Sequence, residues 1–298
     1  MVSAQKPGPL PAWLERIYPF QPATFTTPQG ASMSYLDEGP RQEEAVLMLH
    51  GNPTWSFYYR DLVLDLAPTR RCVVPDHVGM GLSAKPAKYA YTLASRIADV
   101  EALVDSLGLC RVHLVVHDWG GAIGFGLAVR RPDLVGRIVI MNTAAFVSKR
   151  IPKRIELCRA PVIGELIVRG LNGFAEPATF MAMAMRRMSW DERKGFLYPY
   201  DSWAHRIAID RFVRDIPLEP RHPSRAVLEG IEAGLPTLAG HEKMLLWGVR
   251  DFCFDESFLA RWLEIFPDAR LERLERAGHY VLEDAGAEAR SRIAAFLL

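Results

Sequence analysis

The segment from Leu114 to Gly124 constrains the fold of this chain more than any other part of the sequence. Its first residues are mostly apolar, as in a buried strand, whereas its last residues are rich in glycine and suit a helix packed closely on a sheet. Asp118 stands where the two halves meet. The sequence therefore predicts a sharp turn from a strand into a helix, with a carboxylate at the bend, in an α/β fold with a mostly parallel sheet.

A carboxylate at such a bend is in position to react. In the nucleophile elbow of α/β-hydrolases a reactive side chain occupies a strand-to-helix turn, and the N-terminus of the helix faces the developing charge. Here Asp118 stands where serine is usual. A carboxylate can displace a leaving group from saturated carbon or open a strained ring, and it then forms an ester with the substrate. The simpler alternative is that Asp118 only caps the helix.

Two further residues complete a chain order of nucleophile, acid and histidine, each after a strand-like run. The run 243–248 is followed by Asp251, and the alternating run 270–275 is followed by His279. We expect His279 to act as a general base, and we expect Asp251 to orient it and support its charge. Together with Asp118 these residues would form a catalytic triad.

The other acids and histidines have ordinary explanations. Asp76 lies before the bend, and Asp255 lies farther from its strand than Asp251, so both are weaker candidates for the triad acid. The remaining histidines are expected to be structural or at the surface: His50, His77, His113, His117, His205, His222 and His241.

A second apolar run, 45–49, ends in a His-Gly-Asn-Pro turn at residues 50–53. A strand that ends in this way suits an oxyanion loop, so the backbone N–H groups of Asn52 and Trp119 are expected to stabilise charge on an Asp118 ester. The Asn52 amide and the Trp119 indole are also uncharged donors that suit a leaving anion between them. The simpler alternatives are that Asn52 is a plain turn residue and that the Trp119 ring only packs.

The motifs at 50–57, 117–121 and 277–279 together resemble those of the haloalkane dehalogenase family of α/β-hydrolases, and the resemblance covers nearly the whole chain. It implies an α/β-hydrolase fold with an inserted helical cap. It also implies a triad at the positions of Asp118, His279 and Asp251, and halide binding at the positions of Asn52 and Trp119.

Longer strings at 75–83, 199–203 and 278–284 look closest to one subgroup, the β-lactone decarboxylases of bacterial long-chain olefin biosynthesis. This resemblance implies a small apolar substrate, a cis-β-lactone that is converted to a cis-alkene and carbon dioxide. It also implies an assembly with other enzymes of olefin biosynthesis.

Three alternatives stay open beside this interpretation. Haloalkane dehalogenation would use the same residues, with water activated by His279. An epoxide hydrolase would need cap tyrosines such as Tyr198 and Tyr200, but Asn52 argues against that role. A non-catalytic binding protein on the same scaffold is disfavoured by the complete triad.

The composition bounds the cellular context and the partners. With 298 residues, of which 49% are hydrophobic and 24% charged, the chain can form one large core, and its net charge of +1 gives no reason to expect nucleic acid. We expect no cofactor and no metal. No signal peptide or membrane-spanning run is recognisable, and the cysteines suggest reduced thiols in a cytoplasm: Cys72, Cys110, Cys158 and Cys253.

The pattern of strands and helices predicts the domain organisation. The expected core covers residues 1–147 and 218–298, and an inserted helical cap covers 148–217. The expected core elements are strands near 45–50, 72–76, 111–117, 136–142, 243 and 269, and helices at 57–66, 92–107 and 121–131. The methionine-rich stretch 180–188 in the cap suits an adaptable apolar channel for alkyl chains, although helix packing explains each methionine alone.

Overall fold

The computed structural model describes residues 9–298, and within them it forms an eight-stranded sheet with the order β1-β2-β4-β3-β5-β6-β7-β8. The strands are β1 (Ala23–Thr26), β2 (Ser32–Glu38), β3 (Glu44–Leu49), β4 (Cys72–Pro75), β5 (Arg111–Asp118), β6 (Val135–Thr143), β7 (Lys243–Gly248) and β8 (Arg270–Leu274). Strand β2 is antiparallel to both β1 and β4, and all other neighbours are parallel. The predicted α/β fold with a mostly parallel sheet is confirmed.

The central strands are apolar on both faces because helices cover both sides of the sheet. In β5 every residue except Arg111 is buried, and β6 is buried apart from Arg137. The strands predicted near 45–50, 72–76, 111–117 and 136–142 match the structure within one residue at each end. The antiparallel strands β1 and β2 were not predicted.

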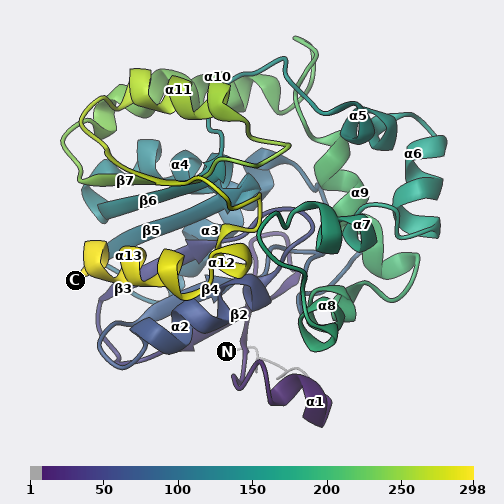
Figure 1. The fold of residues 1–298 in the computed structure, drawn as a ribbon, viewed down its shortest axis with the longest axis horizontal. Helices are drawn as coiled ribbons and strands as arrows, with labels where there is room; N and C mark the ends of the chain where they lie inside the picture. The colour runs from purple at the N-terminus through teal and green to yellow at the C-terminus, as the bar shows by residue number, and fades with distance from the viewer. Residues whose placement is uncertain (1–8) are drawn as a thin grey trace.

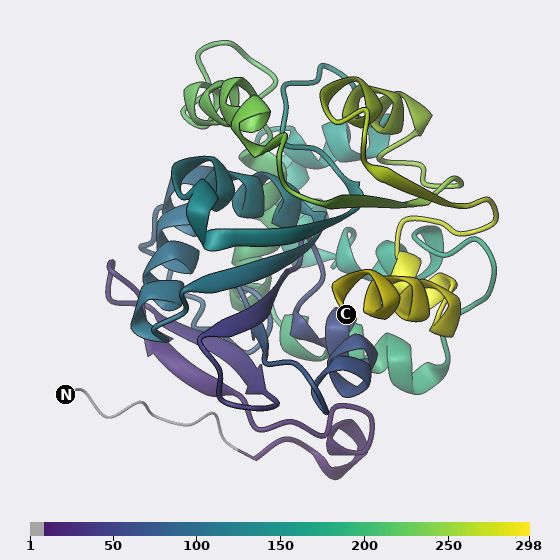
Figure 2. The ribbon, with the colours of Figure 1, turned by 90° about the vertical axis from the view of Figure 1, so that its left-hand side faces the viewer.

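Helices pack on the two faces of the sheet as separate groups. Helices α2 (Arg60–Leu66) and α13 (Ala287–Leu297) contact each other on one face, and α3 (Leu93–Ser106) contacts α4 (Trp119–Arg130) on the other (Figure 2). The further helices of the core are α1 (Ala12–Glu15), η1 (Ser56–Tyr59), η2 (Pro132–Leu134), α10 (Arg225–Gly234), η6 (Leu235–Leu238), α11 (Glu256–Ile265) and α12 (Val281–Asp284).

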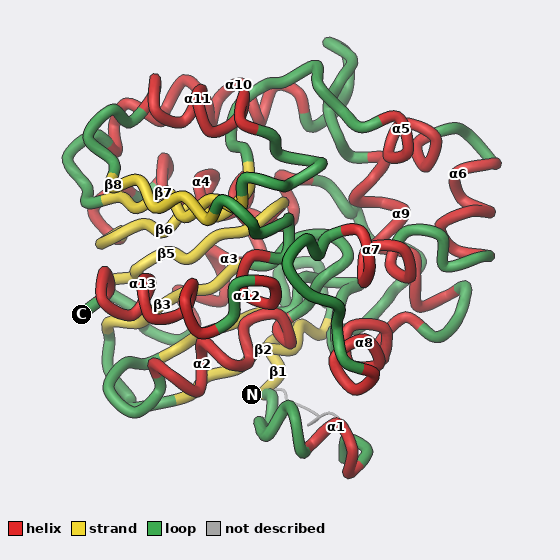
Figure 3. The backbone as a smooth tube through the Cα atoms, in the orientation of Figure 1, coloured by secondary structure: helices red, strands yellow, loops and turns green. Residues whose placement is uncertain are grey.

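The residues between β6 and α10 form a group of short helices beside the sheet (Figure 1). They are α5 (Lys153–Arg159), α6 (Ile163–Glu165), the π-helix η3 (Leu166–Gly170), α7 (Ala175–Met181), α8 (Trp190–Leu197), η4 (Tyr198–Tyr200), η5 (Ala204–Arg206) and α9 (Ile207–Arg214). Figure 3 shows this part of the chain as helices joined by loops, next to the ends of the strands. We refer to residues 148–217 as the cap.

Among the described residues 9–298, no helix combines the length and the apolar character needed to cross a bilayer. The four cysteines are free thiols, of which Cys72 and Cys158 are buried.

Candidate active site

Asp118 lies at the bend between β5 and α4 with φ 51° and ψ −128°. A positive φ at a non-glycine residue is strained by about 1–3 kcal/mol and is found mainly where a site requires it. Glycines make room for this bend. A Cβ atom at Gly51 would lie 1.9 Å from Asp118 Oδ1, and one at Gly120 would lie 1.9 Å from the Leu49 carbonyl oxygen. The carboxylate is therefore held against the end of β3, and it makes no side-chain cap for α4.

The three residues predicted as a triad lie together. The Asp251 carboxylate accepts a hydrogen bond from His279 Nδ1 at 2.7 Å, and His279 Nε2 lies 3.7 Å from Asp118 Oδ2. Because a proton on Nδ1 faces Asp251, the lone pair of Nε2 faces Asp118. The imidazole is thus oriented toward the bend by an acid from the loop after β7.

The rival acids have structural partners instead. Asp76 accepts the backbone N–H groups of Ser56 and Leu82 at 2.7 and 2.8 Å. Asp255 precedes α11, accepts the N–H of Ser257 and forms an exposed ion pair with Arg150. In the structure the carboxylate that pairs with His279 is that of Asp251.

Burial and neighbouring charges set the protonation of the site. Burial disfavours a charged His279, but the charge and hydrogen bond of Asp251 and the charge of Asp118 together outweigh this effect, so the pKa of His279 is raised. Burial also raises the pKa of Asp118, and the positive potential of His279 and two backbone N–H bonds offset only part of the effect. The site therefore holds a carboxylate that water stabilises poorly, next to an imidazole that readily becomes positive.

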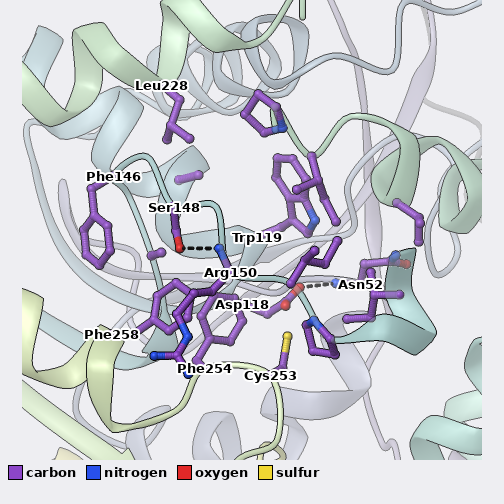
Figure 4. Close-up of a pocket in the computed structure, with 18 of the residues that line it drawn as sticks. Asn52, Asp118, Trp119, Phe146, Ser148, Arg150, Leu228, Cys253, Phe254 and Phe258 are labelled. Carbon is purple, nitrogen blue, oxygen red and sulfur yellow. Dashed lines mark hydrogen bonds between the residues drawn. The ribbon is translucent and has the colours of Figure 1, made fainter. Parts of the chain in front are cut away.

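The two residues predicted as oxyanion donors, Asn52 and Trp119, lie beside the Asp118 carboxylate. The Asn52 N–H donates to Asp118 Oδ1 at 2.6 Å, and the Trp119 backbone N–H lowers the pKa of the same carboxylate. The Asn52 amide donates to the carbonyl of Ile209 in α9 at 3.2 Å. Figure 4 shows Asn52, Asp118 and Trp119 around the same space. The arrangement provides donors for an oxyanion and, in the Asn52 amide, a second N–H for a leaving anion.

Asn142 is a site residue that the sequence reasoning missed. Its amide donates to Asp251 Oδ2 at 2.9 Å and to the Gly248 carbonyl at 3.0 Å, and its oxygen accepts the Gly248 N–H at 2.8 Å. The Cys253 N–H donates to the other oxygen of Asp251 at 2.6 Å. The signal was a polar residue inside the buried run of β6, at the carboxyl end that parallel strands share.

We predict that Asn142→Ala lowers kcat roughly ten- to hundredfold, because one hydrogen bond to a buried charged group contributes about 1.5–3 kcal/mol. Asn142 is expected to act by holding Asp251 and not by contacting the substrate, so KM should change little. Steady-state kinetics measure both values, and a thermal melt checks that β6 and β7 stay paired. An unchanged kcat would show that Asp251 is held well enough by the remaining bonds.

Three of the histidines predicted as structural, His50, His77 and His117, are fully buried and hydrogen-bonded. His117 Nε2 hydrogen-bonds the carbonyl of His279 at 2.9 Å, and its ring stacks on Tyr58 at 4.6 Å between centroids. His77 Nε2 hydrogen-bonds the carbonyl of His50 at 3.0 Å. Burial lowers the pKa of His50 to about 4 and the pKa values of His77 and His117 well below the usual range. These rings therefore brace the loops that carry Asn52 and His279.

The cap is hydrogen-bonded to the loop that carries His279. The Asp284 carboxylate accepts the backbone N–H groups of Ala184 in the cap and of Gly278 next to His279, each at 2.7 Å. In addition, the Tyr280 N–H donates to the cap carbonyl of Ala182 at 2.9 Å. Asp284 and Tyr280 therefore connect the cap to the loop that carries His279.

Two cavities reach Asp118 beneath the cap, with volumes of about 130 and 370 Å³. Their linings are mainly apolar. Of the methionines in the stretch 180–188, Met181 alone contributes to these two linings, so most of the predicted thioether channel was wrong. Tyr200 is buried and bonds the Thr54 carbonyl, so it does not offer its hydroxyl to the cavities.

Comparisons with known proteins agree with this geometry. A family model described as alpha/beta hydrolase fold matches residues 44–286. A protein named cis-3-alkyl-4-alkyloxetan-2-one decarboxylase from Shewanella oneidensis is 43% identical over 290 residues, which cover 95% of this chain and 90% of that protein. The protein of the same name from Xanthomonas campestris is also 43% identical, with 94% and 97% covered.

A solved structure shows the same overall arrangement. The crystal structure of haloalkane dehalogenase DbeA from Bradyrhizobium elkani has a TM-score of 0.83 to this chain at 27% sequence identity, with 93% of this chain and 98% of that chain covered. In sequence, the chain is thus more similar to the two decarboxylases than to this dehalogenase.

Proposed function

The chain belongs to the α/β-hydrolase family, and from this premise we propose that it is a β-lactone decarboxylase, which converts cis-β-lactones with two long alkyl chains into cis-alkenes and carbon dioxide. An oxetan-2-one is a β-lactone, so the relatives at 43% identity are named for this reaction. The observation that carries the proposal is the Asp118 carboxylate, which borders apolar cavities and lies 3.7 Å from His279. A carboxylate is a nucleophile suited to saturated carbon.

In the first step an oxygen of Asp118 attacks the saturated ring carbon that is bonded to the ring oxygen, and the configuration of that carbon is inverted. The bond from this carbon to the ring oxygen breaks, and its electron pair leaves on the oxygen as a carboxylate. The new carboxylate would bind where a halide binds in a dehalogenase, between the donors of Asn52 and Trp119. The product of this step is an ester between Asp118 and the alkyl chain.

In the second step the bond between the neighbouring carbon and the new carboxylate group breaks, and carbon dioxide leaves. The electron pair of that bond forms the alkene and expels Asp118 as a carboxylate. An anti elimination after one inversion is net syn, so the cis relationship of the alkyl groups is retained. No water is consumed, and His279, held by Asp251, stabilises the charge that returns to Asp118.

Two alternatives use the same residues. In haloalkane dehalogenation, halide would leave between Asn52 and Trp119, and a water activated by His279 would hydrolyse the ester. Attack of Asp118 on the lactone carbonyl would also open the ring. The first alternative is favoured by the structural likeness to DbeA and disfavoured by the higher sequence identity to the decarboxylases.

One assay separates lactone from halide chemistry. Purified protein is incubated with a synthetic long-chain cis-β-lactone and, separately, with ethylene dibromide, and alkene and bromide are measured. The proposed function requires alkene from the lactone at a kcat/KM far above that for bromide release. Bromide release without alkene would replace it with dehalogenation.

We predict that Asp118 gains no heavy oxygen when the enzyme turns over a β-lactone in ¹⁸O-labelled water, because carbon dioxide loss itself frees the carboxylate. Hydrolysis of the ester would instead place an oxygen from water in Asp118 at each turnover. Mass spectrometry of the peptide that contains Asp118, after many turnovers, measures the label. A labelled aspartate after lactone turnover would overturn the decarboxylative route.

Residues 148–217 would act as the cap domain of this enzyme, between core segments 1–147 and 218–298. We place the enzyme in the cytoplasm, where free thiols persist, in an assembly with other enzymes of olefin biosynthesis.

A further inference from the structure

We propose that the two cavities are the two arms of one forked substrate site, and that each arm binds one alkyl chain of the β-lactone. This inference rests on the proposed function, and it adds where each alkyl chain binds and which residues limit its length. Asp118 and Asn52 border both cavities, so the reacting carbon and the leaving carboxylate lie at the fork.

The first arm extends from Asp118 between the core and the cap. Leu228 of α10 and Phe258 of α11 line it, and Trp119 borders this arm alone. In Figure 4, Leu228, Phe146 and Phe258 lie on the side of the cavity away from Asn52. The exposed Arg150, which pairs with Asp255 at 2.9 Å, also lines this arm.

The second arm extends from Asp118 beneath the cap. Met181 and Ala178 of α7 line it together with Cys158 of α5, and His279 borders this arm alone. The exposed Arg154 lies at its outer side, where its guanidinium covers the ring of Phe252 at 4.9 Å. The two arms therefore differ in most of their lining residues and meet at the same carboxylate.

Three residues besides Asp118 and Asn52 border both arms: Ile155, Phe174 and Cys253. Ile155 and Phe174 come from the cap, and Cys253 comes from the loop after β7. None of these side chains is charged, and burial raises the pKa of the Cys253 thiol well above its usual range. The fork is thus apolar apart from the reacting groups.

The chemistry of the substrate matches a fork rather than a single tunnel. The two alkyl chains are attached to adjacent saturated carbons of a four-membered ring, so they leave the ring in different directions. Burying each methylene group in an apolar arm is favourable, whereas a chain without an arm would either remain in water or displace protein atoms. A site with two arms can bury both alkyl chains and so obtain the favourable free energy of burial for each, while the lactone ring stays at Asp118.

The test uses two unsymmetrical cis-β-lactones, one with a long chain at the ring carbon beside the carbonyl and a short chain at the other, and the reverse. Leu228→Trp narrows the first arm and Met181→Trp narrows the second, and each variant is the matched control for the other. We expect each variant to lower kcat/KM for one of the two lactones about tenfold more than for the other. The lactone that is more strongly affected should differ between the two variants. Variants that penalise the same lactone, or both lactones equally, would overturn the two-arm site.

If a tryptophan variant fails to fold, Leu228→Ala and Met181→Ala replace it, because they enlarge the arms. Each should shift the preferred chain length upward at one ring position only. A shift at both positions, or at neither, would contradict the assignment of one chain to each arm.

A binding measurement separates this proposal from the proposed function. Asp118→Asn protein is titrated in a calorimeter with a sixteen-carbon acid that is branched at its α-carbon and with the straight-chain acid of equal size. We expect the branched acid to bind at least about tenfold more tightly, with the advantage lost in either tryptophan variant. Equal affinities would overturn the two-arm site even if wild-type enzyme makes alkene. A wild-type enzyme that makes no alkene would overturn the proposed function, whatever the acids do.

Discussion

Replacement of Asp118 by Asn is expected to lower alkene formation at least about 10⁴-fold, the scale of loss found when a covalent nucleophile is removed. A neutral amide does not displace a leaving group from saturated carbon. The other carboxylate of the triad, Asp251, faces His279 rather than the fork. Gas chromatography of the alkene measures the loss, and peptide mass spectrometry verifies that the introduced asparagine has not been hydrolysed back to aspartate.

The same variant separates catalysis from folding. Asn tolerates a positive φ better than most residues and needs no buried charge, so the melting temperature should stay the same or rise. Asp118→Ala should be equally inactive. Retention of a tenth of the wild-type activity in either variant would exclude the covalent mechanism, and a large loss of thermal stability in the Asn variant would favour a structural role for Asp118.

Replacement of Asp251 by Asn is expected to lower kcat by orders of magnitude with the fold intact, because His279 loses the charged partner that orients it. Asp251 holds the proton on His279 Nδ1 and balances the charge of the imidazolium. Because Asp251 raises the pKa of His279, its removal should lower that pKa. The inflection that His279 contributes to the pH–rate profile should therefore move to lower pH, an effect that a merely structural residue would not produce.

Asp255→Asn is the matched control for this prediction. Asp255 lies four residues away, on the same loop, and its carboxylate caps α11 and pairs with the exposed Arg150. We expect its loss to change kcat less than about threefold, since exposed ion pairs and caps contribute little to the site itself. A larger effect at Asp255 than at Asp251 would show that the acid of the triad is wrongly assigned.

The parts of the fold that the sequence predicts are those with strong local patterns. β5 and β6 are mostly apolar runs between helical segments, and this pattern indicates a parallel sheet covered on both faces. Strand β1 is only partly buried, and β2 contains both buried and partly exposed residues without a regular alternation. Their pairing therefore depends on tertiary contacts that no local pattern reveals.

The candidate site divides in a similar way. The positions of Asp118 and His279 follow from turns directly after strands, because parallel strands bring their carboxyl ends to one edge of the sheet. The role of Asn142 depends on a hydrogen bond to Asp251 across two neighbouring strands, which spacing alone does not give. The two arms depend on how the cap packs over the core, and the methionine pattern of 180–188 was therefore a poor guide to their linings.

The hydrogen bonds between cap and core have a consequence for how the site opens. Asp284 and Tyr280 tie the cap to the loop of His279, and the Asn52 amide is bonded to the cap carbonyl of Ile209. A rigid lifting of the cap would break these bonds together and release the histidine loop and the anion donor at the same moment. Any wide opening of the cap would therefore also disturb the residues that orient His279 and the anion donor Asn52, so the cap is part of the architecture of the active site as well as its cover.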